Sequence, residues 1–184
     1  NVQDGNRAGH SGHIHSNTFT KGELGGIHDK RHAMAICKQQ NINIITIKYD
    51  VSKAHRRTAA LPKDWRHLVV RLEDENGRTE YWINLVHTYG VASAQHYWGR
   101  TAAAFTRLQY QLDGDIVYVF VYVDDYSLLV RDTNPIALAT YIFAIVETYG
   151  LPVAYNKIYI GYNETYVGYI THLKTHRLDI TDER

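Results

Sequence analysis

Two adjacent carboxylates, Asp124 and Asp125, are the residues of this chain best suited to chemistry. They stand between two runs rich in Val, Leu, Tyr and Phe, which are typical of β-strands. The pair therefore falls at the tip of a tight hairpin, although the turn lacks the Asn-Gly, Asp-Gly or leading Gly that such turns favour. A local rule broken on an apolar hairpin indicates a functional site. Paired carboxylates are hard oxygen ligands of the kind that Mg²⁺ prefers, and the alternative is an exposed acidic turn.

A third carboxylate is supplied by the run from Ile42 to Asp50, in which isoleucines and a tyrosine predict a strand that ends in the acid. If this strand pairs beside the hairpin, Asp50 converges with Asp124 and Asp125. Two-metal phosphoryl-transfer sites need such a group of oxygens to hold two ions about 3.5–4 Å apart.

Apolar patterning and turn residues predict the remaining elements. They are, in chain order, two strands joined by an Asn-Gly turn (67–72 and 79–85), a helix (93–112), a second helix capped by Asn134 (135–150), and two short strands (157–161 and 165–170). This order predicts an α+β fold, an antiparallel sheet with helices packed on one face.

Bulk properties narrow the function classes. The chain has 184 residues, enough for one domain with a core, and it does not begin with Met, so we expect a fragment of a longer protein. Its single cysteine, Cys37, can form no internal disulfide, which favours a reducing, intracellular compartment such as cytoplasm or nucleus. No signal peptide is evident, and the longest apolar run, 116–123, is shorter than the roughly 20 residues that cross a bilayer, so no membrane partner is expected.

The net charge of +1 does not indicate a nucleic-acid partner, but its distribution does. Residues 48–71 contain seven basic and two acidic residues. Such a stripe suits a phosphate backbone, and a solvated charged face is the alternative.

Five short motifs occur in the order that reverse transcriptases use in their palm domain. Asp50–His55 resembles motif A, Tyr89–Gln95 motif B, Tyr122–Asp125 the Tyr-x-Asp-Asp motif C, Gly150-Leu151 with Lys157 motif D, and Tyr166–Tyr169 motif E. The resemblance covers about 42–170, and it departs from the family at Gln95, where proline is frequent. It implies partial fingers in the irregular, His- and Gly-rich segment 1–41, a palm in 42–170, and in 171–184 the start of a connection toward a missing thumb. The resemblance is to reverse transcriptases of retroelement or cellular type.

The resemblance implies an RNA-directed DNA polymerase that adds deoxynucleoside triphosphates to the primer 3′ end of an RNA or DNA template–primer. Asp50, with Val51 beside it, and Asp124 would hold two Mg²⁺ ions, with Mn²⁺ as the alternative metal. Asp125 would take a lesser share. Lys157 would donate a proton to the departing pyrophosphate, and an ordinary surface lysine is the alternative for this residue.

Other positions of the motifs imply contacts with substrates. His55 stands where the family places the residue that excludes a ribose 2′-hydroxyl. The remaining implied contacts are to the nucleotide (Tyr89, Gly90 and Ala94) and to the primer or template (Tyr122, Tyr166, Gly168, Arg56 and Arg57).

Three other functions stay open from the sequence. The first is a palm that binds nucleic acid without catalysis, and the second is an RNA-dependent RNA polymerase. The third is a metal-binding module built on the histidines near the start (His10, His13, His15, His28 and His32), for which solvated loop histidines are the simpler interpretation.

Overall fold

The computed structural model describes residues 26–112 and 114–181, which form two compact units. The sheet unit contains the described residues 26–52 and 102–181, and the hairpin unit contains residues 53–101. The predicted domain boundaries after residues 41 and 170 concern family domains rather than compact units, and they stay a prediction.

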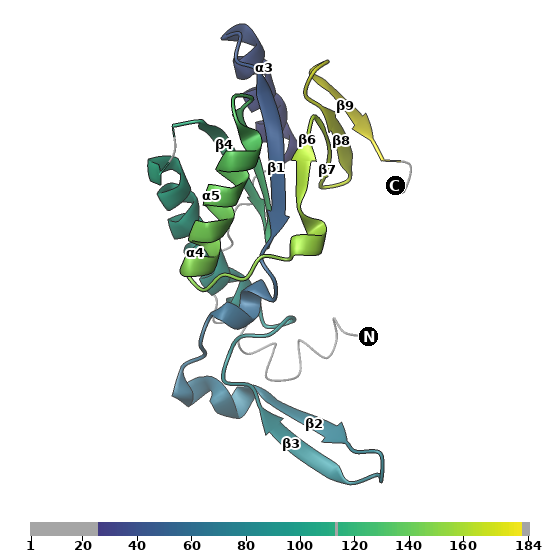
Figure 1. The fold of residues 1–184 in the computed structure, drawn as a ribbon. Helices are drawn as coiled ribbons and strands as arrows, with labels where there is room; N and C mark the ends of the chain where they lie inside the picture. Colours follow the sequence, from purple (N-terminus) through teal and green to yellow (C-terminus); the bar gives the residue numbers. More distant parts are fainter. Residues whose placement is uncertain (1–25, 113, 182–184) are drawn as a thin grey trace. The chain divides into compact units, whose positions relative to one another are not determined.

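The sheet unit is built on a four-stranded antiparallel sheet in the order β4-β5-β1-β6. Its strands are β1 (Ile44–Asp50), β4 (Ile116–Tyr122), β5 (Asp125–Arg131) and β6 (Tyr159–Gly161). β1 lies between β5 and β6, so it is a central strand. Figure 1 shows β6 along one side of β1. The predicted pairing of the Asp50 strand with the acidic hairpin is confirmed.

Both predicted helices are present, as α4 (Ala92–Leu112) and α5 (Pro135–Thr148). The Asn134 side chain accepts a hydrogen bond of 3.3 Å from the N–H of Ala137, which caps the start of α5. Gly150, with φ of 73°, follows the end of α5 and adopts the left-handed conformation that glycine tolerates.

The two predicted helices cover the same face of the sheet. Side chains alternate along a strand, so the odd-numbered residues of β1 and the even-numbered residues of β5 share this face. Tyr126 packs against Phe105 of α4 with 6.1 Å between ring centroids, and Tyr49 packs against Phe143 of α5 at 5.6 Å.

The opposite face is covered by α3 (Ile27–Gln39), a helix that the sequence did not predict (Figure 1). One buried cluster joins α3 to the strands: Ala33, Met34, Cys37, Ile44, Phe120 and Leu129. Two predictions are therefore wrong. Helices do not pack on one face only, and the irregular segment does not run to residue 41, because α3 occupies residues 27–39. Because Lys30 is one of the four buried positions of α3, the apolar stripe that would mark the helix is short.

A separate three-stranded sheet follows, formed by β7 (Asn163–Tyr166), β8 (Tyr169–His172) and β9 (Arg177–Ile180). The prediction of one strand over 165–170 is wrong, because Val167 and Gly168 have φ of 49° and 76° and turn the chain back on itself. Residues 166–169 are thus a hairpin turn with its two ends paired.

The hairpin unit contains β2 (Val69–Glu73) and β3 (Thr79–Ile83), as predicted. Gly77 in the connecting turn has φ of 75°, which explains the Asn-Gly pair in the sequence. A short 3-10 helix, η1 (Ala54–Arg57), begins this unit.

Candidate active site

Strand register brings the three acidic residues to one end of the sheet. Asp50, the last residue of β1, lies directly opposite Asp125, the first residue of β5. Asp124 occupies the turn between β4 and β5, because Tyr122 already pairs with Asp125. The backbone carbonyl of Asp124 accepts a hydrogen bond of 3.1 Å from the N–H of Val51, which ties the turn to the strand that carries Asp50.

The turn itself is strained. Val123 has φ of 60°, a left-handed conformation that is unfavourable for a β-branched residue. Such strain persists only where the surrounding structure imposes it, and it is found most often at functional sites. The paired strands on each side impose it here, and they hold Asp124 at a defined position in the turn.

The electrostatics of these carboxylates favour a cation. Burial raises the pKa of Asp124, and the negative charge of Asp50 raises it further. Burial also raises the pKa of Asp125, against the opposing effect of the Lys48 ammonium group. A cation bound among Asp50, Asp124 and Asp125 would favour the charged carboxylates and so lower the pKa of both Asp124 and Asp125.

Two lysines supply positive charge in the structure. Lys157, in the short 3-10 helix η3 (Tyr155–Lys157), donates a hydrogen bond of 2.6 Å from Nζ to Oδ2 of Asp50. This hydrogen bond raises the pKa of Lys157. Nζ of Lys48 lies 3.8 Å from Oδ2 of Asp125. The structure therefore places Lys157 at the acidic group, where a role in proton transfer requires it.

The residue types fit a pair of Mg²⁺ or Mn²⁺ ions, because the donors are carboxylate oxygens at adjoining strand ends. In the part of the chain that the structure describes, no three His, Cys, Asp or Glu side chains are close enough together to hold one ion. Coordination would therefore require the carboxylates of Asp50, Asp124 and Asp125 to turn toward the ion and Lys157 to release Asp50. The share of Val51 in metal binding stays a prediction.

The predicted nucleotide contacts belong to the hairpin unit. His55 is 5% exposed, its Nε2 lies 2.9 Å from Oε1 of Gln95, and its ring packs edge-on against Tyr89 at 4.9 Å. Gly90 has φ of 83°, and Ala94 is buried. The structure thus groups His55 with Tyr89 and reveals Gln95 as its hydrogen-bond partner. The role of this group toward a nucleotide stays a prediction.

The predicted primer and template contacts fall in different environments. Tyr122 is 41% exposed at the end of β4, beside the acidic turn. Tyr166 is only 1% exposed, and Nζ of Lys30 lies 4.4 Å from its ring centroid, so its side chain belongs to the core. Gly168 is in the β7–β8 turn. Only the backbone of the Tyr166 position could contact a primer in this arrangement.

The remaining predicted residues receive a simple placement. Arg56 and Arg57 are exposed in η1 of the hairpin unit. Of the histidines near the start, those at 10, 13 and 15 lie outside the described residues, and His28 and His32 lie in α3. In the described residues, no helix combines the length and apolar character needed to cross a membrane.

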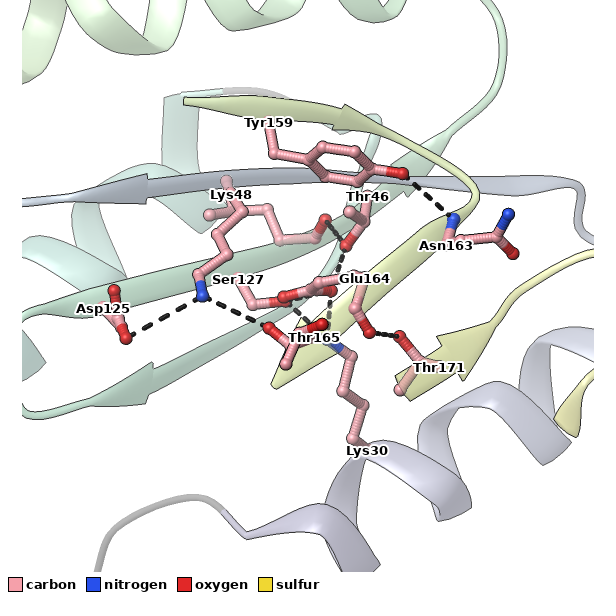
Figure 2. Close-up of polar contacts among 11 residues, drawn as sticks. Lys30, Thr46, Lys48, Asp125, Ser127, Tyr159, Asn163, Glu164, Thr165 and Thr171 are labelled. Atoms are coloured by element: carbon pink, nitrogen blue, oxygen red, sulfur yellow. Dashed lines mark hydrogen bonds and ion pairs between the residues drawn. The ribbon is translucent and has the colours of Figure 1, made fainter. Parts of the chain in front are cut away.

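The sequence did not predict the polar residues that lie next to Asp125 on the same face of the sheet. Lys48 lies beside Asp125, and the buried pair Lys30 and Glu164 lies next to Lys48 along the same face (Figure 2). A signal was present in β1, where polar Thr46, Lys48 and Asp50 alternate with apolar residues. That alternation indicates one polar face on a strand that the structure places in the centre of the sheet.

Comparison with known proteins identifies the fold. No protein-family model matches the chain, and no curated protein matches it by sequence. Apo telomerase from Candida tropicalis, truncated from its C-terminal domain, has a TM-score of 0.62 at 8% identity. The match covers 97% of this chain and 43% of the telomerase chain. Telomerase from Candida albicans, in complex with the TWJ fragment of telomeric RNA, has a TM-score of 0.63 at 10% identity over 100% of this chain and 37% of its own.

A foamy viral protease-reverse transcriptase in complex with double-stranded DNA is similar to the same degree. Its TM-score is 0.63 at 14% identity, and the match covers 94% of this chain and 28% of the viral chain. The chain thus spans less than half the length of each of these structures. The identities are low, so the likeness is one of fold, and that fold is mixed helix and antiparallel sheet of the reverse-transcriptase type.

Proposed function

We propose that this chain carries the palm of an RNA-directed DNA polymerase, which adds deoxynucleotides to the 3′ end of a primer on a nucleic-acid template. One observation carries the proposal: Asp50 lies opposite Asp125, with Asp124 in the turn between β4 and β5, in a fold shared with reverse transcriptase and telomerase. Two of the similar structures are complexes, one with a fragment of telomeric RNA and the other with double-stranded DNA, which supports a template–primer as the partner here.

The residues divide the work by position. Asp50 and Asp124 would be the main ligands of two Mg²⁺ ions, and Asp125 would take a smaller share because Lys48 already faces it. When bound, two such ions lower the pKa of the attacking hydroxyl and neutralise charge on the leaving pyrophosphate. Lys157 holds its proton strongly beside Asp50, and it would protonate the pyrophosphate once released from that carboxylate. Apart from this proton transfer, the protein would contribute positioning and charge stabilisation, which account for most of the catalysis of phosphoryl transfer.

Primer extension tests the proposal directly. The full-length protein is given an RNA template with a DNA primer, deoxynucleotides and Mg²⁺, beside the variants Asp124→Asn and Asp115→Asn. Asp115 is a matched control, because it precedes β4 at the end of that strand opposite Asp124. We expect extension by the unvaried protein and by Asp115→Asn, and a loss of at least about a hundredfold in Asp124→Asn, as when one charge-stabilising group is removed from a reaction centre.

A palm that binds nucleic acid without catalysis is the second candidate. It is favoured by the ion pair of Lys157 with Asp50, which occupies the carboxylate that a metal would need. Template–primer binding that survives removal of Mg²⁺, with no extension by the unvaried protein, would establish this candidate instead. Extension with ribonucleotides in preference to deoxynucleotides would indicate an RNA-dependent RNA polymerase.

A further inference from the structure

In the described structure no backbone ladder joins the sheet formed by β7, β8 and β9 to the main sheet. The two sheets are linked by the chain at Tyr162, between β6 and β7, and by side-chain contacts. The central attachment is the carboxylate of Glu164 in β7. Its Oε2 accepts hydrogen bonds from Oγ1 of Thr46 at 2.7 Å and Oγ of Ser127 at 3.0 Å, and it forms an ion pair with Nζ of Lys30 (Figure 2). Glu164 and Lys30 are 2% and 0% exposed, so this attachment is shielded from solvent.

Lys48 continues the same polar layer toward the acidic residues. It lies on the same face of β1 as Thr46 and Asp50, and its register partner on β5 is Ser127. Figure 2 shows its side chain extended between Asp125 and β7. Nζ donates a hydrogen bond of 3.2 Å to the carbonyl oxygen of Thr165, and it lies 3.8 Å from Oδ2 of Asp125.

The position of the Thr165 carbonyl depends on its neighbour Glu164. Because the Glu164 carboxylate is bound by groups from α3, β1 and β5, the backbone of β7 cannot shift along the face without breaking a buried ion pair. Breaking such a pair from one side is strongly unfavourable, since it leaves a charge buried without a partner. Thr165 is therefore a fixed acceptor for Lys48.

We propose that Lys48 is a positioning residue for Asp125, held in place by the Thr165 carbonyl that Glu164 fixes. The inference rests on the proposed function, in which Asp125 shares in metal binding. Lys157 contrasts with Lys48, because its side chain is 57% exposed whereas that of Lys48 is 23% exposed and held from two sides. Lys157 can therefore leave Asp50 when an ion enters, while Lys48 stays at Asp125 and limits the share of the ion's charge that Asp125 takes.

The experiment is a double-mutant cycle on metal binding. Mn²⁺ alone is titrated into the full-length protein by calorimetry, for Lys48→Met and Lys48→Arg, each with Asp125 intact and in an Asp125→Asn background. We expect Lys48→Met to tighten Mn²⁺ binding by about threefold to fivefold with Asp125 intact, the effect of losing one partly exposed charge pair. In the Asp125→Asn background the same substitution should change Mn²⁺ binding by less than about twofold, because the partner charge is absent.

A second measurement separates positioning from a purely structural role. Lys48→Met should lower the kcat of primer extension by roughly tenfold while the KM for deoxynucleotide stays unchanged, because a misplaced carboxylate affects the reacting geometry rather than substrate binding. Lys48→Arg should restore most of the kcat. A structural role would instead weaken Mn²⁺ binding and lower kcat together.

The inference is overturned if Lys48→Met changes Mn²⁺ binding equally in both backgrounds, if it changes neither, or if the unvaried protein binds no Mn²⁺. Failure of the proposed function gives a different result. A protein that binds Mn²⁺ and shows the expected cycle, but extends no primer on any template, would retain the Lys48 assignment and lose the polymerase.

Discussion

Lys157 and a divalent cation compete for the same carboxylate oxygen, so the variant Lys157→Met should bind metal more tightly than the unvaried protein. Nζ of Lys157 lies 2.6 Å from Oδ2 of Asp50, and the two side chains are 57% and 7% exposed. An ion that coordinates Asp50 must displace this ammonium group, and the free energy of the displaced contact is subtracted from the free energy of metal binding.

The magnitude follows from the exposure of the pair. Because Lys157 is more than half exposed, solvent screens the charge pair, and its contribution is about 1 kcal/mol rather than the larger value of a buried pair. Since about 1.4 kcal/mol corresponds to a tenfold change in Kd, we expect Lys157→Met to lower the Kd for Mn²⁺ or Mg²⁺ by about fivefold.

The assay is titration of Mn²⁺ into the two proteins in the absence of nucleotide. Lys38→Met is the matched control. Lys38 is an exposed lysine near the end of α3 and precedes the start of β1, whereas Asp50 stands at the other end of β1. The control should leave the Kd unchanged within experimental error. Unchanged or weaker binding in Lys157→Met would refute the competition, and equal tightening in Lys38→Met would show that net charge alone is responsible.

The structure leads to further predictions. Glu164→Gln should lower the free energy of unfolding in urea by about 3–5 kcal/mol, since it leaves the Lys30 charge buried without its partner. The double variant Glu164→Gln with Lys30→Met should recover most of this loss. Equal stability of the single and the double variant would contradict this reasoning. His55→Ala should admit ribonucleotides in primer extension, with a smaller effect for Gln95→Leu, which frees the His55 ring; unchanged sugar discrimination would remove His55 from this role. Burial lowers the pKa of His87 below its ordinary value of 6.5, so the unfolded chain binds the proton more readily than the folded protein does. The contribution of neutral His87 to the free energy of unfolding is therefore complete above pH 6.5, and it falls as the pH drops through 6.5. The free energy of unfolding in urea should therefore differ less between about pH 7.5 and about pH 5.5 in His87→Gln than in the unvaried protein. An equal difference in the two proteins would exclude His87 as the source of the pH dependence.

The acidic hairpin and its neighbour strand could be predicted from sequence because their signals are local. The runs on each side of Asp124 have strong strand character, and the strand that ends in Asp50 has the same character. Adjacent antiparallel strands have few registers that keep every apolar side chain buried, so the meeting of Asp50 with Asp125 follows from patterning together with the expected pairing.

The β7–β8 turn and α3 depend on information that a local pattern does not contain. Val167 adopts a left-handed conformation that its residue type disfavours, so a continuous strand was the natural prediction for 165–170. Lys30 is buried in α3 only because Glu164, 134 residues later in the chain, reaches the same place. A lysine in a helix otherwise indicates a solvent-exposed position.

Lys48 shows why the support of the acidic residues could not be inferred from the sequence. The alternation of Thr46, Lys48 and Asp50 in β1 is what a strand with one face in water would show. In the structure this face is instead covered by a second polar layer, in which Glu164 binds Thr46 and the carbonyl of Thr165 binds Lys48. The same alternation thus fits two environments, and in the second the polar side chains have fixed partners. A strand whose polar face ends in a predicted metal ligand should therefore be examined for a covering carboxylate before its lysines are assigned to solvent.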